Sequence, residues 1–240
     1  MQQITGLIRS IQVGLPEEAH AESSVDDRRP QPWTTGIFKR PLRGPIHLRT
    51  LNLDGDGQAD LVHHGGIDKA VCVYPSEHWG HWSSILPQRP LVGGEFGENF
   101  TLEGLTEAEV CIGDIFSVGS AVIQISQPRQ PCWKLARRWQ IKDLAVQVEQ
   151  TGFTGWYFRV LQEGLVDANI PLHLTDRSYP EWTVTRANQI MHHERSNVTA
   201  AERLSLCPLL SASWQQTLQQ RSRHQPSPDP QQRQFGDSSV

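Results

Sequence analysis

Cys132 stands in the segment whose residue types point most directly to chemistry. Pro128 and Pro131 hold the residues before it extended, because proline fixes its own backbone and disfavours helix in its neighbour. A helix is expected to begin directly after the cysteine, with Arg129 before it and Lys134 after it. A helix N-terminus and nearby cations favour the thiolate, which attacks electrophiles and binds soft metals. A buried cysteine acting as a small hydrophobic residue is an equal alternative from these residues alone.

A glycine-rich segment, residues 54–69, places His64, Gly65, Gly66 and Asp68 ahead of an expected strand. Its first residues imitate a calcium-binding EF-hand loop. The twelfth position is Gly65, where that loop needs a bidentate acid, so calcium binding of this kind is excluded. The glycines suit a close approach of the backbone to a ligand. A turn with polar surface residues is an equal alternative for this segment by itself.

Two further segments carry weaker indications. The run GGEFGEN, which ends at Asn99, lacks the GxGxxG spacing, so dinucleotide binding is not supported. Its local sequence favours a turn over a ligand site. The run FKRPLR gathers cations that include Lys39 and Arg43, and such a cluster suits an anionic phosphate. A solvated basic edge is the more common outcome for a cluster of this kind.

Short apolar stretches separated by glycine, proline and aspartate fill residues 33–174 and indicate the strands of a barrel or sandwich. The clearest strand is residues 121–126, where Ala121, Ile123 and Ile125 share one face. Other strands are expected at residues 5–15, 36–38, 46–53, 70–74, 99–102 and 114–118, and helices at residues 76–85 and 133–150. The pattern by itself therefore predicts a mainly β (α+β) fold with a few helices and leaves a barrel and a sandwich both open.

The pattern changes after Asp176. Residues 183–193, 199–206 and 211–223 have the character of three short helices, with Thr183 and Thr199 as N-caps of the first two. Residues 17–32 are polar without a hydrophobic period and are expected to form a long surface loop. The last residues are rich in Gln, Pro and Ser and are expected to be disordered. The expected organisation is a mainly β domain at 1–176, a three-helix domain at 177–224 and a disordered tail at 225–240.

Composition limits the classes of protein. The 240 residues are 37% hydrophobic and 20% charged with a net charge of −4, which suits a globular protein and argues against a nucleic-acid binder. The sequence has no apolar run long enough for a membrane span, and its first residues lack a secretory signal. The four cysteines are scattered without a CxxC motif, as in a reduced cytoplasmic protein.

Four blocks together resemble the MOSC family, named for the C-terminal domain of molybdenum-cofactor sulfurases, and within it the YiiM-type branch. The blocks are FKRPLRGP, DGDGQADLVHHGGIDKAVCVYP, GEFGENFTLEGL and GDIFSVGSAVIQISQPRQPCWKL. Their order and spacing make the resemblance specific, and it covers residues 6–223. The resemblance implies a mixed but mainly β barrel followed by a small three-helix (3-alpha) domain.

The resemblance also implies roles for particular residues. The family's marker cysteine falls on Cys132, which would supply a thiolate to molybdenum or carry sulfur. The positions that match the other markers are Lys39, His64, Gly65, Gly66, Glu98 and Asn99. A pterin carrying phosphate and dithiolene sulfur needs cations, backbone donors and one soft protein ligand. The candidate contacts to such a molybdenum cofactor (molybdopterin) are Lys39, Arg43, His64, Gly65, Gly66, Asp68, Asn99 and Arg129, with Cys132 as the metal ligand.

The activity that the resemblance implies is reduction of N-hydroxylated bases, such as 6-hydroxylaminopurine, to the amine. The sequence has no flavin, iron–sulfur or nicotinamide motif, so electrons are expected from a separate reductase. Pyridoxal phosphate is not expected, because no lysine stands in a setting that favours a Schiff base. The oligomeric state stays open.

Two other functions remain open from the sequence. Cys132 could accept sulfur as a persulfide and deliver it, since a thiol of low pKa serves that role as well. The chain could also be a non-enzymatic binding module whose helical domain recognises a protein. Trp214 and Leu218 would then be exposed, although their place in the pattern favours the core of the helical bundle.

Overall fold

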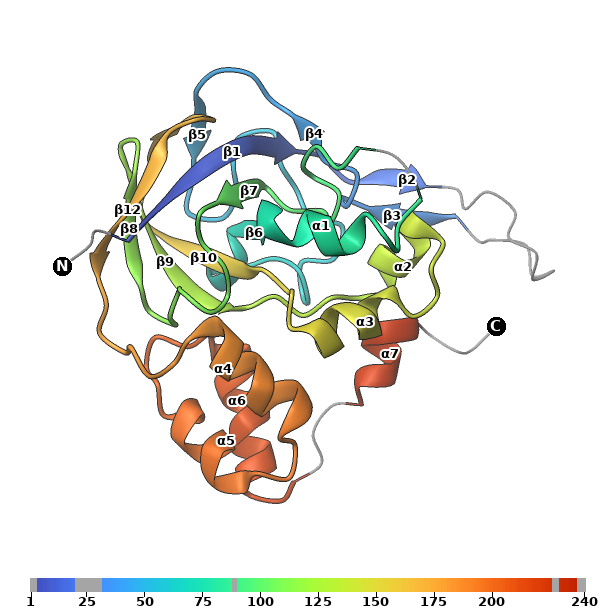
Figure 1. The fold of residues 1–240 in the computed structure, drawn as a ribbon, viewed down its shortest axis with the longest axis vertical. Coiled ribbons are helices and arrows are strands. Elements are labelled where there is room, and N and C mark those ends of the chain that lie inside the picture. Colours follow the sequence, from blue (N-terminus) through green and yellow to red (C-terminus); the bar gives the residue numbers. More distant parts are fainter. Residues whose placement is uncertain (1–3, 20–31, 88–89, 226–228, 237–240) are drawn as a thin grey trace.

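The computed structural model describes residues 4–19, 32–87, 90–225 and 229–236. Within them, seven strands close into a barrel because β12 pairs with both β8 and β1 (Figure 1). Most neighbouring strands are antiparallel, and β6 and β7 are parallel. The barrel strands in spatial order are β1 (Thr5–Val13), β7 (Phe100–Glu103), β6 (Val71–Pro75), β10 (Trp156–Gln162), β9 (Ala121–Pro128), β8 (Ile115–Val118) and β12 (Pro171–Asp176).

Short strands extend this barrel. Strand β4 (Arg40–Pro41) pairs with the end of β1, and β5 (Ile46–Leu48) pairs with β11 (Gly164–Val166). Strand β2 (Glu17–Ala19) pairs with β3 (Trp33–Thr35). The expected fold class, a mainly β barrel with flanking helices and a small helical region, is confirmed.

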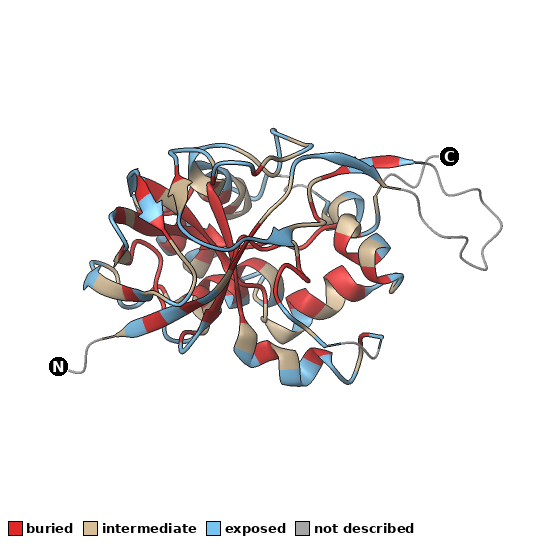
Figure 2. Ribbon diagram, turned by 90° about the horizontal axis from the view of Figure 1, so that it is seen from above, coloured by how far each residue is buried: buried red, intermediate tan, exposed pale blue. Residues whose placement is uncertain are grey.

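Apolar side chains fill the barrel. In Figure 2 much of the ribbon of the barrel strands has the colour of buried residues. Ala121, Ile123 and Ile125 point inward from β9 as their alternation predicted, and each is at most 1% exposed. The opposite face of β9 was expected to face solvent. On this face the residues in the C-terminal half of the strand are buried instead. The helical region packs there, and the amide of Ser211 donates to the carbonyl of Ser126 at 2.9 Å.

Several predicted elements have different bounds. A strand was expected at residues 36–38, but β3 precedes them, and β5 stops at Leu48 because the chain turns back between Arg49 and Asn52. The loop expected at residues 17–32 begins with β2, and residues 20–31 lie outside the described residues. Strands β10, β11 and β12 had no individual prediction.

The helix expected at residues 133–150 is two helices, α2 (Trp133–Trp139) and α3 (Leu144–Thr151). Gln140 ends α2 because its φ of 56° lies in the left-handed region. The helix expected at residues 76–85 is a short turn followed by α1 (Trp79–Trp82). No helix among the described residues is long and apolar enough to cross a membrane.

Three helices follow the barrel as expected: α4 (Val184–Asn188), which continues as a wider turn, α5 (Val198–Ser205) and α6 (Ala212–Ser222). Thr183 caps α4 by accepting from the amide of Arg186 at 3.0 Å, which confirms that prediction. Asn197, and not Thr199, caps α5. Trp214 and Leu218 are 1% and 0% exposed, so they form the bundle core and not a docking surface.

The disorder expected for residues 225–240 is corrected in part. Residues 230–235 form helix α7 (Pro230–Phe235), which lies beside α2 and α3 (Figure 1). Pro230 suits the first helical position, and the Asp229 carboxylate caps the helix by accepting from the amide of Gln231 at 2.9 Å. Composition suggested disorder because composition gives no information about the tertiary contacts that hold this helix.

The fold predicts that the charge of Arg177 contributes to stability. Arg177 binds the fully buried carboxylate of Asp114 through two hydrogen bonds, of 2.9 and 2.6 Å. Arg177→Ala should lower the free energy of unfolding by about 3 kcal/mol or more, because it leaves a buried carboxylate without its cation. Urea unfolding followed by circular dichroism measures this. Arg9→Ala is the control, since the Arg9–Glu103 pair is half exposed and should contribute less than about 1 kcal/mol. Equal losses would contradict the prediction.

Candidate functional site

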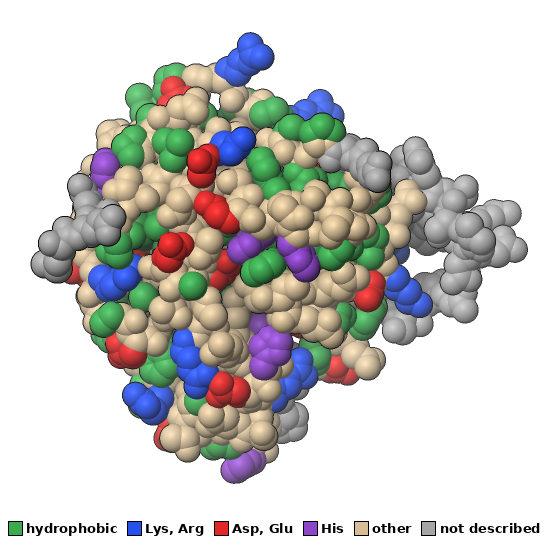
Figure 3. All heavy atoms as spheres, in the orientation of Figure 1, with side chains coloured by type: hydrophobic (Ala, Val, Ile, Leu, Met, Phe, Trp, Pro, Cys, Tyr) green, Lys and Arg blue, Asp and Glu red, His purple; other side chains and the backbone are tan. Residues whose placement is uncertain are grey.

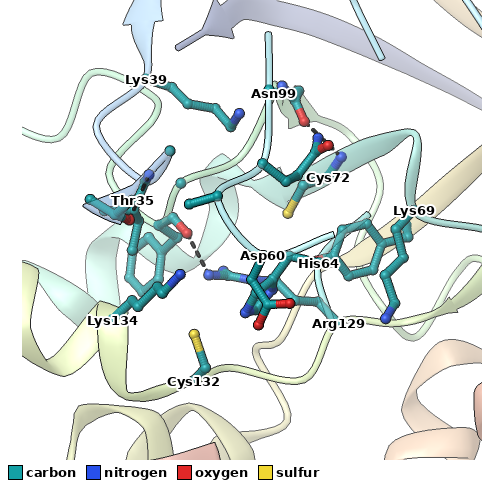
Figure 4. Close-up of a pocket in the computed structure, with 18 of the residues that line it drawn as sticks. Thr35, Lys39, Asp60, His64, Lys69, Cys72, Asn99, Arg129, Cys132 and Lys134 are labelled. Atoms are coloured by element: carbon teal, nitrogen blue, oxygen red, sulfur yellow. Dashed lines mark hydrogen bonds between the residues drawn. The ribbon is translucent and has the colours of Figure 1, made fainter. Parts of the chain in front are cut away.

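A cavity opens where strands β6 and β10 meet the segments that precede β4, β6 and α2 (Figure 4). Its volume is about 620 Å³, with the open mouth included. Five of the residues selected from the sequence line it. They are Lys39, His64, Asn99, Arg129 and Cys132.

Cys132 lies at the N-terminal end of α2, where its carbonyl accepts from the amide of Leu135 at 3.0 Å. Its side chain is 9% exposed and points into the cavity (Figure 4). Burial opposes ionisation of the thiol, but the charge and hydrogen bond of His64 outweigh it, with smaller help from the amide of Lys134 and the charge of Arg129. The pKa of Cys132 is thereby lowered to about 7, so a large fraction is thiolate at neutral pH.

Arg129 is a buried cation of the cavity. It is 6% exposed, and its Nη2 donates to the carbonyl oxygen of Phe96. Its Nη1 is buried and has no hydrogen-bond partner among the described residues. Buried guanidinium N–H groups nearly always have acceptors, so this donor suits an anionic group bound in the cavity.

A tight turn at residues 94–98 places the acceptor for Arg129. The Glu98 carboxylate accepts from the amides of Gly94 and Phe96 at 2.6 and 2.9 Å. This role agrees with the turn that the local sequence favoured. The turn aims the Phe96 carbonyl at Arg129, so Glu98 acts on the cavity without lining it.

Lys39 and Asn99 line the cavity, but the polar groups of both side chains already have partners within the protein. Lys39 forms an ion pair with Asp56, and the two side chains are 6% and 0% exposed. Asn99 donates to the same carboxylate at 2.9 Å and accepts from the amide of Cys72 at 3.0 Å. These residues therefore build the wall, and the Lys39 charge is already compensated by Asp56.

Two candidates lie away from the cavity lining. Arg43 is exposed beyond the cavity, so the structure does not bring it to the site. Asp68 pairs with Arg159 at 2.8 Å and accepts from the amide of Ala212 at 3.3 Å, so it joins the barrel to α6. Sequence alone placed both near a ligand because it shows their neighbours along the chain and not the direction of their side chains.

Gly65 and Gly66 follow His64 and turn the chain at the cavity edge without lining it. A Cβ on Gly65 would stand 3.1 Å from the carbonyl oxygen of Leu61, so a larger residue would crowd the turn. Gly66 has a φ of 95°, which side chains rarely adopt. The glycine pair therefore positions His64 beside Cys132.

The structure adds cavity residues that the sequence did not single out. Cys72 and Tyr157 are opposite each other on β6 and β10 and both line the cavity. Burial raises the pKa of both side chains, so they keep their protons where Cys132 loses its own. No local sequence signal marks them, because their proximity comes from strand pairing. Thr35 and Asp60 also line the cavity, and so does Lys69, which the glycine-rich segment was expected to display ahead of the strand.

The outer surface has a mixed character. On the face shown in Figure 3, positive and negative side chains are interspersed and do not gather into one basic patch. The absence of a nucleic-acid partner stays a prediction from the sequence.

Comparisons with known proteins agree with these features. The MOSC domain model matches residues 60–173, and the YiiM-like, 3-alpha helix domain model matches residues 182–225. The chain is 50% identical over 214 residues to the uncharacterized protein YflK of Bacillus subtilis, which is 89% of this chain and 93% of YflK. A Gibberella moniliformis protein named "Reductase" is 32% identical over 161 residues, which is 66% of this chain and 28% of that protein.

A solved structure supports the same family assignment. The crystal structure of YiiM from Geobacillus stearothermophilus superposes with a TM-score of 0.74 at 41% identity, and covers 90% of this chain and 99% of that one. Sequence, domain order and fold all agree. The chain belongs to the MOSC domain family, with the barrel followed by the YiiM-like three-helix domain.

Proposed function

We propose that this protein binds a molybdenum cofactor through the Cys132 thiolate and reduces N-hydroxylated bases, such as 6-hydroxylaminopurine. The observation that carries the proposal is the pairing, in one cavity, of a thiol with a pKa of about 7 and a buried guanidinium with a free N–H. MOSC domains are associated with molybdenum-cofactor binding, and the relative named "Reductase" supports an oxidoreductase.

The residues present fit such a cofactor. A soft metal centre needs a thiolate, which Cys132 offers at the cavity wall. Arg129 Nη1 would donate to an anionic group, and Lys69 and Lys134 add positive charge to the lining. When bound, the cofactor supplies a metal that takes up and releases electrons in pairs.

The remaining cavity residues have defined tasks in this proposal. His64 keeps Cys132 ionised through its charge and hydrogen bond. Converting a hydroxylamine to an amine consumes two electrons and two protons and releases water. The Tyr157 hydroxyl stays protonated because burial raises its pKa, so it can hold a proton beside a bound substrate.

We propose that the electrons come from a separate reductase. The sequence carries no flavin, iron–sulfur or nicotinamide motif through which the chain could accept them from a soluble donor. Substrate reduction would then require two proteins.

Molybdenum content tests the proposal directly. Protein purified from cells that make molybdenum cofactor should hold near-stoichiometric molybdenum by elemental mass spectrometry, and Cys132→Ala should hold little, because it lacks the soft ligand. Cys207→Ala is the matched control, since Cys207 is a buried cysteine of the helical region and should leave the metal content unchanged.

A parent protein without molybdenum would overturn the proposal. A sulfane sulfur on Cys132 in that protein, absent from Cys132→Ala, would establish sulfur carriage instead. Both roles use the same ionised thiol, so metal and persulfide analysis of one preparation separates them.

The electron source has its own test. Purified protein with NADH and 6-hydroxylaminopurine should form no amine, because no group in the chain takes hydride. Adding a flavin reductase, or a chemical electron donor with a viologen mediator, should start turnover, followed by chromatography of the purine. Turnover with NADH alone would contradict the need for a separate reductase.

The thiol is expected to ionise near neutral pH. In protein from cells without molybdenum cofactor, the rate of Cys132 alkylation by iodoacetamide should reach half its maximum near pH 7. His64→Ala should raise this midpoint by about one pH unit or more, because the thiolate loses its main stabilising partner while burial remains. Peptide mass spectrometry gives the rates.

His63→Ala is the matched control. His63 is the neighbouring histidine, but its side chain is 76% exposed and pairs with Asp60. Its removal should leave the midpoint where it is. An unchanged midpoint in His64→Ala would show that another group ionises Cys132.

A further inference from the structure

Helix α7 packs against the part of the chain that carries Cys132 (Figure 1). Gly236, which ends the helix, lies against the Trp133 ring, where an added Cβ would stand 3.4 Å from the ring. Gln234 is 9% exposed and donates to the Glu149 carboxylate at 2.6 Å. The helix is therefore tied to both α2 and α3.

Arg233 makes the central contacts of this helix. It forms an ion pair with Glu149 on α3, and its Nη1 donates to the carbonyl oxygen of Pro131 at 2.5 Å. Pro131 directly precedes Cys132 in the chain. One guanidinium thus joins α3 to the segment that holds the reactive thiol.

Glu149 needs this cation. Its side chain is 6% exposed, and a buried carboxylate is costly without a positive partner. His192 lies 3.6 Å from it, but burial and the charge of Arg233 lower the pKa of His192 to about 3, so the imidazole is neutral. Arg233 therefore carries the positive charge of the cluster, and the pair holds α7 in place.

The Pro131 carbonyl is an effective point at which to hold Cys132. The peptide unit is planar, so the carbonyl of Pro131 and the amide of Cys132 move together. Pro131 has no N–H of its own to fix the segment. The backbone just before Cys132 is held at Arg129, whose amide donates to the carbonyl of Gly155 at 3.1 Å, and at Pro131, whose carbonyl accepts from Arg233.

We propose that Arg233 is a positioning residue for Cys132: anchored on Glu149, it orients the Pro131–Cys132 peptide so that the thiol faces His64 and Arg129. Helix α7 places Arg233 where it can make both contacts. This rests on the proposed function only in taking Cys132 as the reactive group, and no molybdenum is needed to test it.

The test uses the full chain from cells without molybdenum cofactor and the rate at which iodoacetamide alkylates Cys132 at one high pH, where the thiol is ionised in every variant. Arg233→Ala should raise this rate about twofold or more, because a Pro131–Cys132 peptide that is no longer held exposes the thiol more often. Arg233→Lys restores a cation beside Glu149 and should return the rate toward that of the parent. Arg223→Ala, which removes an exposed arginine at the end of α6, should leave the rate unchanged.

If Arg233→Ala does not fold, Glu149→Gln takes its place, because it removes the anchor while keeping the side-chain size. It should raise the alkylation rate as well. Parent-like alkylation rates in the folded variants would overturn the proposal and leave α7 a structural addition. A parent protein without molybdenum would contradict the proposed function but would leave these alkylation rates unaffected.

Discussion

A guanidinium buried beside a thiol is the constraint on which the cavity depends. Arg129 is 6% exposed, so its guanidinium needs acceptors within the protein. The turn at residues 94–98 offers it a carbonyl, and the Glu98 carboxylate holds that turn. The positive charge that results helps His64 to keep Cys132 ionised. The N–H that remains free is the feature of the cavity most suited to an anion. Ligand binding and thiol chemistry thus share one cation.

The barrel provides the rigid frame for this arrangement. Strand β9 runs through the sheet and ends at Pro128, so it delivers Arg129 and then Cys132 to one edge of the cavity. Its neighbour β10 brings Tyr157 opposite Cys72 on β6. The helical region covers the outside of β9. Because every strand of the barrel is paired on both sides, these side chains hold positions that loops alone would not maintain.

The charges around the cavity are divided by function. Lys39 is neutralised by Asp56 and serves the wall, whereas Arg129 keeps a donor for a ligand. Cys72 and Cys132 differ in the same way, since burial keeps the first protonated and polar neighbours ionise the second. Residue type alone does not assign these roles, because they depend on the partners of each side chain.

The sequence by itself determined the mainly β character, the three following helices, the Thr183 cap and the place of Cys132 before a helix, because these depend on residues a few positions apart. It left a barrel and a sandwich both open, and the pairing of β12 with β1 closes the barrel. The tertiary structure decided the rest. It left Arg43 outside the cavity lining, turned Asp68 to the helical region and made a helix of residues 230–235. It also split the helix at Gln140. These outcomes depend on strand pairing and on burial between segments that are far apart in the chain. The local sequence pattern determines neither of them.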